Sequence, residues 1–285
     1  GLQAKAACAW WSRSCTCAIW ATYFLCLVGY LIIIADSVIP TMDYMGLWRR
    51  LGLSAGSART AVLTVAMASI CPLCFLSQAQ LSFTSLLGTF SNCFIVFALM
   101  LNYVEDELAG GHKGEKHLLS DPSASAPCLI SPPMSEGNLA FISAVLMAIV
   151  IQPCILPMYA EMPEGTRTPQ NFARALRVAF GFLYLLFFAF GTVGYLSFGS
   201  SANGNVLNNL PSEKWYTITS RLSMAVVCLG VYPLMMYPMV SVLGEQRRTR
   251  GVLAVNLLVL LASLRVDNLG VINVLCGAVS VFFFV

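Results

Sequence analysis

The stretch CAIWATYFLCLVGYLIIIADSVI runs from Cys17 to Ile39, carries Asp36 as its single charged residue and is followed by Pro40. A helix needs about 20 consecutive apolar residues to cross the hydrocarbon core of a bilayer, and this stretch is long enough. Proline has no N–H with which to continue a helix, so we predict a transmembrane helix that ends at Pro40.

The whole chain shares the character of this stretch. Of its 285 residues, 58% are hydrophobic and 10% are charged, whereas soluble domains carry about 25% charged residues. A chain with so little charge is expected to turn its outer surface to lipid rather than to water. Its formal net charge of +3 is small and scattered, which gives no indication of a nucleic-acid partner.

Seven further apolar runs follow the first. They cover residues 61–77, 81–103, 138–159, 175–198, 219–243, 251–264 and 268–285. We therefore predict an all-α integral membrane protein, a bundle of about eight transmembrane helices. Only residues 78–80 separate the second run from the third, and we expect these two helices to form an antiparallel hairpin.

The segment Val104–Gly137 is acidic, rich in proline and serine and without apolar periodicity, so we predict one long loop there. Helices that cross a membrane alternate in direction, which places eight Lys and Arg residues on each side. The side that carries the clusters Arg167–Arg177 and Arg247–Arg250 holds its charges on short connections, which favours a cytoplasmic location. The long loop is then non-cytoplasmic.

Both ends of the sequence suggest a longer protein. The chain begins with Gly1 rather than Met, and it stops at Val285 inside an apolar run. We therefore expect residues 1–285 to form a single transmembrane domain that is truncated at both ends.

The most informative motif is IVIQPCILPMY, from Ile149 to Tyr159. Pro153 leaves the carbonyl of Ile149 without its helical partner, and Pro157 does the same to the carbonyl of Pro153. Free carbonyls inside a membrane protein can bind a substrate ammonium group or a cation, as in the broken helices of transporters. The alternative is a plain proline kink that a neighbouring Ser or Thr satisfies. The candidate substrate-binding residues are Ile149, Val150, Gln152, Pro153, Cys154 and Pro157.

The run 219–243 repeats this device, since Pro233 frees the carbonyl of Leu229 and Pro238 frees that of Leu234. Two interrupted helices in one bundle indicate a binding site better than one does. We therefore predict that the run is broken at its prolines. The further candidate substrate-binding residues are Leu229, Gly230, Tyr232 and Pro233.

Asp36 is the acidic residue inside the first apolar run, and an ionisable group within a membrane helix is a functional hypothesis by default. It lies four residues before Pro40, so the simpler interpretation places it in water at the membrane interface. We keep it as a candidate for coupling transport to an ion.

Motifs typical of enzymes are absent from the sequence. There is no glycine-rich phosphate loop, no nucleophilic serine elbow and no pair of carboxylates within the apolar runs. Cys71 and Cys74 have the spacing of half a metal site but lack a second pair and a nearby histidine. We predict no catalytic residue, no metal and no cofactor, and we expect most of the eleven cysteines to pack as small apolar side chains.

Several segments resemble, in order along the chain, the amino acid/auxin permease family. QPCILPMYAEM (152–162) is similar to the sixth membrane helix of that family, which often shows His-Pro-x-x-Leu-Pro-x-Tyr-x-Glu. The other similar segments are YLIIIAD (30–36) for the third helix, PLCFL (72–76) for the fourth, GYLSFG and NVLNNLP (194–211) for the seventh and the loop after it, and YPLMMYP (232–238) for the eighth.

The resemblance implies an eleven-helix, five-plus-five inverted-repeat fold of the APC type, of which this chain would hold helices three to ten. Helix one, which contributes to the substrate site opposite helix six, would lie outside it. Gln152 stands where the family frequently has histidine, and the stretch Cys228–Val231 lacks the hydroxyl groups that the sodium-coupled branch tends to carry. Gln152 removes a possible proton carrier, and the missing hydroxyl groups favour proton coupling or facilitated movement over sodium coupling.

We therefore predict secondary active transport of amino acids, with small neutral ones as the expected class and H⁺ or Na⁺ as the coupling ion. The expected location is the plasma membrane or a vacuolar or lysosomal membrane. The amino acid and the lipid bilayer are the expected partners, and no protein partner can be named. An amino-acid sensor of the same fold is the alternative, and a receptor of unrelated fold is a third interpretation that no feature favours.

Overall fold

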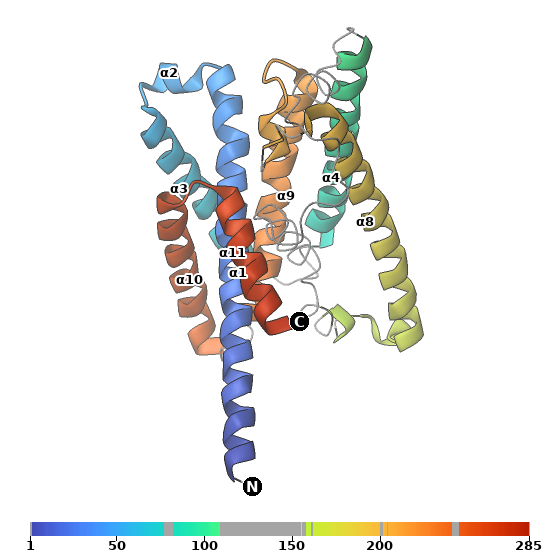
Figure 1. Ribbon diagram of the computed structural model, residues 1–285. Helices are drawn as coiled ribbons and strands as arrows, with labels where there is room; N and C mark the ends of the chain where they lie inside the picture. Colours follow the sequence, from blue (N-terminus) through green and yellow to red (C-terminus); the bar gives the residue numbers. More distant parts are fainter. Residues whose placement is uncertain are drawn as a thin grey trace, which may run out of the picture.

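The computed structural model in Figure 1 describes residues 2–76, 82–108, 155, 158–160, 162–199, 202–203, 205–240 and 245–284. The regular structure of these residues is helical, without strands. The longer helices are α1 (Leu2–Tyr44), α3 (Ala55–Leu73), α4 (Ser82–Leu108), α8 (Pro169–Phe198), α9 (Trp215–Val240), α10 (Glu245–Arg265) and α11 (Leu269–Phe284). The short ones are α2 (Leu47–Leu51), η1 (Glu164–Thr166) and η3 (Val206–Asn208).

Five of these helices, α1, α3, α4, α8 and α9, are long and apolar enough to cross a membrane. The prediction of an all-α, multi-pass membrane protein is confirmed to that extent. The total of about eight spans and the eleven-helix inverted repeat stay predictions. Most of the run 138–159 lies outside the described residues.

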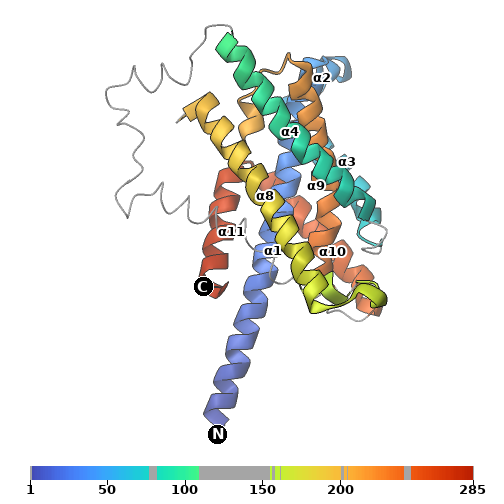
Figure 2. The same cartoon turned by 90° about the vertical axis from the view of Figure 1, so that its right-hand side faces the viewer.

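α1 and α9 form the centre of the bundle and lie side by side in both Figure 1 and Figure 2. α1 also packs against α3, α10 and α11, and α9 also packs against α4. Leu27 and Leu31 of α1 join Tyr232 and Met236 of α9 in the main apolar core. A helix that is apolar on several sides is buried by several neighbours, which is the position that α1 occupies.

The predicted hairpin of the second and third apolar runs is wrong. α3 and α4 run in opposite directions, but α9 lies between them in Figure 1. α3 packs against α1, α9 and α10, whereas α4 packs against α8 and α9. Both helices bury apolar side chains against α9, which therefore separates two elements that are neighbours in the sequence.

The prolines inside α1 and α9 do not end or break these helices. α1 continues past Pro40 to Tyr44, and α9 is continuous through Pro233 and Pro238, so both sequence predictions are wrong. A proline removes one N–H, while the hydrogen bonds of the neighbouring turns remain, and helices packed in a bundle tolerate this loss. Beside Pro40, the hydroxyl of Thr41 donates to the carbonyl of Ser37 at 2.9 Å.

Two predicted boundaries also move. α4 continues to Leu108, so residues 104–108 of the predicted long loop are helical, and residues 109–137 lie outside the described part. α10 begins at Glu245 and thus extends the short seventh run at its start.

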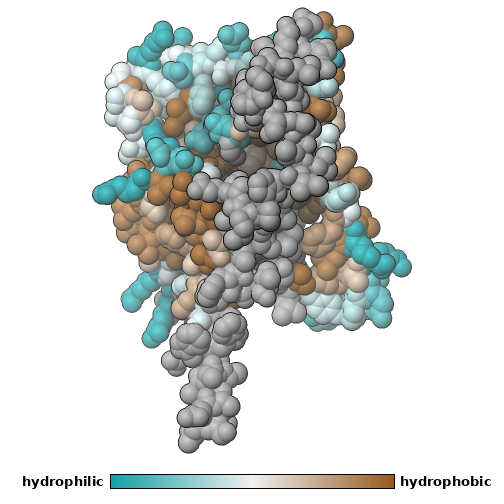
Figure 3. Space-filling view, in the orientation of Figure 1, coloured by the Kyte–Doolittle hydropathy of each residue, from teal (hydrophilic) through white to brown (hydrophobic). Residues whose placement is uncertain are grey.

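The surface carries the apolar side chains that a lipid-facing protein needs. Val178, Tyr184, Leu185 and Phe188 of α8 are all exposed. In Figure 3, brown apolar side chains form a band across the middle of the visible face, with teal polar side chains above and below. This pattern is typical of a protein that is surrounded by lipid at mid-height.

Candidate functional site

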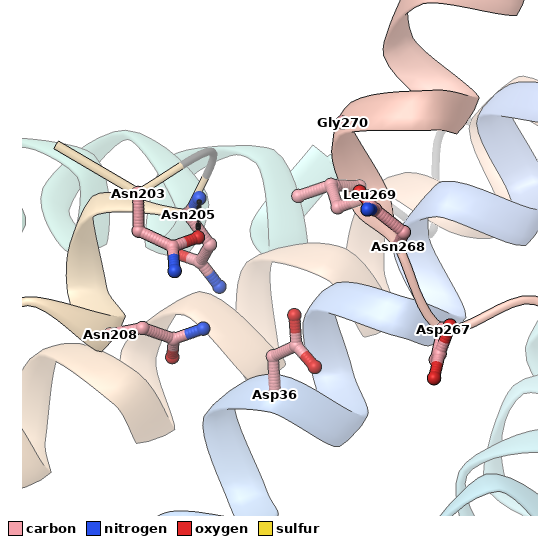
Figure 4. A pocket seen from close by; sticks show the side chains of 8 residues that line it. All are labelled: Asp36, Asn203, Asn205, Asn208, Asp267, Asn268, Leu269 and Gly270. Atoms are coloured by element: carbon pink, nitrogen blue, oxygen red, sulfur yellow. Dashed lines mark hydrogen bonds between the residues drawn. The ribbon is translucent and has the colours of Figure 1, made fainter. Parts of the chain in front are cut away.

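A polar pocket of about 570 Å³ lies at the end of the bundle where α8 ends, α9 begins and α10 passes into α11. Figure 4 shows Asp36 of α1 between the asparagines of the α8–α9 connection and the residues of the α10–α11 connection. We call it the Asp36 pocket. Its lining residues are Asp36, Asn203, Asn205, Asn208, Asp267, Asn268, Leu269 and Gly270.

The Asp36 pocket is rich in oxygen acceptors. Two of its side chains, Asp36 and Asp267, are carboxylates and four are carboxamides, and the described residues that line it include no lysine or arginine. Carboxylate and amide oxygens accept hydrogen bonds from ammonium groups, and those to a carboxylate are strengthened by charge. The pocket therefore fits the positively charged end of a small polar molecule.

Asp36 is half-buried and belongs to a helix that is long enough to span a membrane. A carboxylate in such a helix is costly and usually faces a water-filled cavity or a partner. The structure supplies the cavity, because Asp36 lines the pocket rather than the lipid-facing surface.

Hydrogen bonds within the α8–α9 connection hold its asparagines in place. Oδ1 of Asn205 accepts from the N–H of Leu207 at 3.2 Å and caps η3. The N–H of Asn203 donates to Oδ1 of Asn209 at 2.8 Å, and the N–H of Asn205 donates to Oδ1 of Asn203 at 3.2 Å. Asparagine side chains favour such turns because they replace backbone hydrogen-bond partners. Nδ2 of Asn205 is buried and has no partner among the described residues.

A buried arginine fastens this connection to α9. Arg221 is 2% exposed, and its guanidinium donates to the carbonyls of Leu207 at 3.1 Å and Leu210 at 3.5 Å and to the hydroxyl of Ser212 at 3.0 Å. The side chains of Leu207 and Leu210 are buried against Ile95 of α4 and its neighbours. Both the backbone and the side chains of the connection are therefore anchored to the bundle.

The opposite rim of the pocket is held in a similar way. Arg59 of α3 donates to the carbonyls of Ser263 at 3.3 Å and Val266 at 3.0 Å. These carbonyls lie at the C-terminal end of α10, where helix carbonyls lack partners within the helix. Asp267 follows Val266 directly, and Oδ1 of Asn268 then accepts from the N–H of Val271 at 3.3 Å in the first turn of α11.

A second polar region lies inside the bundle. Tyr232 of α9 is fully buried, and its hydroxyl donates to Oδ1 of Asn256 on α10 at 2.9 Å. Nδ2 of Asn256 points to the sulfur of Cys74, next to the end of α3, at 4.0 Å. We call these three residues the Tyr232 network. It joins three helices, and its polar groups face one another.

α9 and α4 approach each other closely near the Tyr232 network. A Cβ atom placed on Gly230 would lie 3.0 Å from Cβ of Thr84 on α4. Glycine at this position therefore lets the two helices pack tightly, as small residues commonly do at helix contacts in membranes.

The predicted substrate-binding residues of the second proline motif lie in the middle of α9. Gly230, Tyr232 and Pro233 are buried and Leu229 is half-buried, and none of the four lines the Asp36 pocket. The predicted residues of the first motif lie outside the described residues: Ile149, Val150, Gln152, Pro153, Cys154 and Pro157. The role of both groups in substrate binding stays a prediction.

Sequence reasoning found Asp36 but not the other residues of its pocket. The cluster of asparagines between residues 203 and 209 is a visible signal, since it separates two apolar runs. Asp267 is similarly visible as an acidic residue between the last two runs. Their closeness to Asp36 depends on the packing of α1, α9 and α11 and on Arg59 and Arg221.

Comparison with known proteins gives a consistent result. A family model described as "Transmembrane amino acid transporter protein" matches residues 4–285. Vacuolar amino acid transporter 5 of Schizosaccharomyces pombe is 24% identical over 213 residues, which are 74% of this chain and 46% of that protein. Vacuolar amino acid transporter 7 of Saccharomyces cerevisiae is 23% identical over 185 residues, or 65% of this chain and 36% of that protein.

A plant protein shares a shorter segment. Amino acid transporter AVT3C of Arabidopsis thaliana is 31% identical over 97 residues, which are 34% of this chain and 21% of that protein. In all three comparisons the match spans less than half of the relative's own length. No solved structure gives a significant match.

Proposed function

Because this chain belongs to the transmembrane amino acid transporter family, we propose that it forms the central part of a secondary transporter that moves amino acids across a membrane. The Asp36 pocket is the observation that carries this proposal. It combines a carboxylate on a membrane helix with a water-accessible cavity and oxygen acceptors for an ammonium group. Such a constellation suits a ligand that must leave water and enter a helix bundle.

The proposed ligand contact is between the α-ammonium group of the amino acid and Asp36. The amide nitrogens of Asn205 and Asn208 point toward Asp36 across the pocket (Figure 4) and can orient its carboxylate. Nδ2 of Asn205 is a buried donor without a partner among the described residues, and it is the group that we assign to the substrate carboxylate. The pocket is then the first contact on the route to the deeper site.

The deeper site consists of the two proline motifs. By their position four residues before a proline, the carbonyls of Ile149, Pro153 and Leu229 are expected to lack a helical partner, and they are the proposed substrate contacts inside the membrane. Within the second motif, Tyr232 contributes by holding α9 against α10 through Asn256. This assignment gives Leu229 a backbone contact through the carbonyl that Pro233 frees, and it gives Tyr232 a supporting role.

The proposed substrates are small neutral amino acids, because the side chains around the free carbonyls are apolar. The proposed coupling ion is the proton, with Asp36 as its carrier. One feature supports proton over sodium coupling: the stretch Cys228–Val231 lacks the hydroxyl groups that the sodium-coupled branch tends to carry. The proposal assigns no catalysed reaction to the chain.

The proposed location is a vacuolar membrane, by analogy with the names of the two yeast relatives. In the predicted orientation the loops around α8 and α10 that carry arginine clusters face the cytoplasm. The Asp36 pocket lies at the opposite end of the bundle and would open to the vacuolar lumen.

Uptake by the complete protein in proteoliposomes tests the proposal. A panel of labelled neutral, cationic and anionic amino acids is offered under an imposed proton gradient, an imposed sodium gradient or neither. We expect accumulation of neutral amino acids when the proton gradient is present and none with sodium alone. Accumulation driven by sodium would contradict the coupling, and saturable binding without flux would favour a sensor over a transporter.

A further inference from the structure

Arg221 occupies a place where a positive charge is costly. It is 2% exposed, lies on a membrane-spanning helix, and forms no ion pair with an acidic side chain in the described part of the chain. Removing such a charge from water without a counter-ion costs free energy unless hydrogen bonds compensate. The two backbone carbonyls and one hydroxyl that it binds are all in the α8–α9 connection.

The shape of the guanidinium explains why arginine suits this position. Its donors form a rigid planar fork, so several acceptors can be held at fixed directions at once. Lysine carries the same charge on a flexible chain and offers a single nitrogen. Arg221 therefore fixes the direction of the connection as well as its attachment, which a lysine would not do.

The bond from Arg221 to Leu207 reaches the pocket through the chain itself. Leu207 is the middle residue of η3, directly beside Asn208 and two residues from Asn205. Asn205 and Asn208 both line the pocket and face Asp36 in Figure 4. A shift of the Leu207 carbonyl would move both asparagines relative to Asp36.

We propose that Arg221 is a positioning residue of the Asp36 pocket, which sets the distance between the asparagines of the α8–α9 connection and Asp36 and thereby the affinity for the substrate. This inference rests on the proposed function for its effect on affinity. Its geometric part, the hold of Arg221 on the connection, does not need transport and has its own test.

The first test uses thiol labelling in the complete protein. Asn208→Cys places a thiol at the exposed rim of the pocket, and a membrane-impermeant maleimide reports how accessible it is, with the protein that lacks this substitution as background. We expect Arg221→Lys to change the labelling rate several-fold, because the connection is no longer held in one direction. Arg265→Lys, at an exposed arginine on α10, is the matched control and should leave the rate unchanged.

The second test measures KM for the transported amino acid. We expect Arg221→Lys to raise KM about tenfold while Vmax per folded protein changes little, since misplaced contacts weaken binding. Combined with Asp36→Asn, the effect of Arg221→Lys on KM should be smaller, because the contact that it aligns has lost its charge. A merely structural role would raise KM by the same factor in both backgrounds and would overturn the proposal.

The remaining outcomes separate the two proposals. An unchanged labelling rate with Arg221→Lys overturns the positioning role whether or not the protein transports. If Arg221→Lys changes the labelling rate but the wild-type protein moves no amino acid, the positioning role is supported and the proposed function is contradicted. If Arg221→Lys does not fold, Ser212→Ala removes one of the three hydrogen bonds instead. Then a labelling rate that moves in neither direction overturns the proposal.

Discussion

The Asp36 pocket and the Tyr232 network are both polar regions of an apolar bundle, and they differ in what their polar groups face. In the network, the tyrosine hydroxyl, the Asn256 amide and the Cys74 sulfur face one another, and all three residues are buried. In the pocket, two carboxylates and four amides line a cavity of about 570 Å³. The network uses its hydrogen bonds to hold helices together, and the pocket presents the carboxylate of Asp36 to the cavity.

The difference also appears in how the two regions are built. Tyr232 and Asn256 lie within long helices, so their position follows from helix packing. The asparagines and Asp267 of the pocket lie on short connections that need Arg221 and Arg59 to hold them. Connections can change position more easily than packed helices, and ligand-contacting residues are commonly found on them. We infer that substitutions in the pocket change affinity, whereas those in the network change stability.

Asp36→Asn is expected to have the largest effect. It removes the charge that we assign to the ammonium contact, and a hydrogen bond to a charged group contributes about 1.5–3 kcal/mol. KM for the transported amino acid should therefore rise at least about tenfold. The unfolding free energy should stay the same or increase, because a half-buried charge is removed.

Asp43→Asn is the matched control for this prediction, since Asp43 is an exposed aspartate on the same helix. Uptake kinetics measured at equal amounts of folded protein compare the two. Equal KM values for Asp36→Asn and Asp43→Asn would contradict the assignment of Asp36 to the substrate.

Gly230→Ala should have the next largest effect, on stability. The new methyl group would meet Thr84 at 3.0 Å, and overpacking of a tight contact costs about 1–3 kcal/mol. Unfolding in mixed detergent micelles measures the change. Gly191→Ala, where nothing lies within 4 Å of the added Cβ, should be neutral or slightly stabilising. Equal stability of the two variants would argue against the close approach of α4 and α9.

Tyr232→Phe should lower stability by about 1 kcal/mol, because hydrogen bonds between membrane helices contribute about 0.6–2 kcal/mol. KM should change less than with Asp36→Asn, since the hydroxyl faces Asn256 and not the pocket. Tyr184→Phe on the exposed face of α8 is the control. A large rise in KM with unchanged stability would instead place the Tyr232 hydroxyl on the substrate.

The smallest effect is expected at the edge of the bundle, where Nζ of Lys214 donates to Oε2 of Glu105 at 2.9 Å. This hydrogen bond raises the pKa of Lys214 above its ordinary value of 10.5, so the pair stabilises the fold at neutral pH. Its contribution is lost as the pH rises through the raised pKa. Both side chains are about half exposed, and such pairs contribute little.

Lys214→Met should accordingly lower the melting temperature only slightly at pH 7. The difference from the wild type should shrink as the pH rises above the ordinary lysine pKa and vanish above the raised pKa of Lys214. A difference in melting temperature that grows with rising pH would contradict a stabilising contribution from the Lys214–Glu105 pair.

The helices of this fold could largely be predicted from the sequence, because apolar length alone decides which segments can cross a bilayer. Their ends and partners could not. Pro40 is a helix breaker in water, but within this bundle α1 continues past it to Tyr44. The hairpin of α3 and α4 failed because packing against α9 was not visible from the short connection between the two helices.

The candidate site could be predicted only in part, for a related reason. Asp36 could be identified alone, because a carboxylate in an apolar run is conspicuous in any sequence. Asn205 and Asp267 can be identified as site residues only after the fold places them beside Asp36, because they are far from it in the sequence. Arg221 was visible as a charge near a helix end, but its role depends on the direction of its side chain toward the α8–α9 connection.

Substrate protection of Asn208→Cys against maleimide tests most directly that the Asp36 pocket contacts the transported amino acid. The labelling rate is measured in the complete protein in proteoliposomes, with and without saturating substrate, and Gln170→Cys at the opposite end of α8 serves as the control. Our account predicts that the substrate slows labelling at residue 208 and leaves residue 170 unaffected. Unchanged labelling at residue 208 during active uptake would contradict it and place the substrate route elsewhere in the bundle.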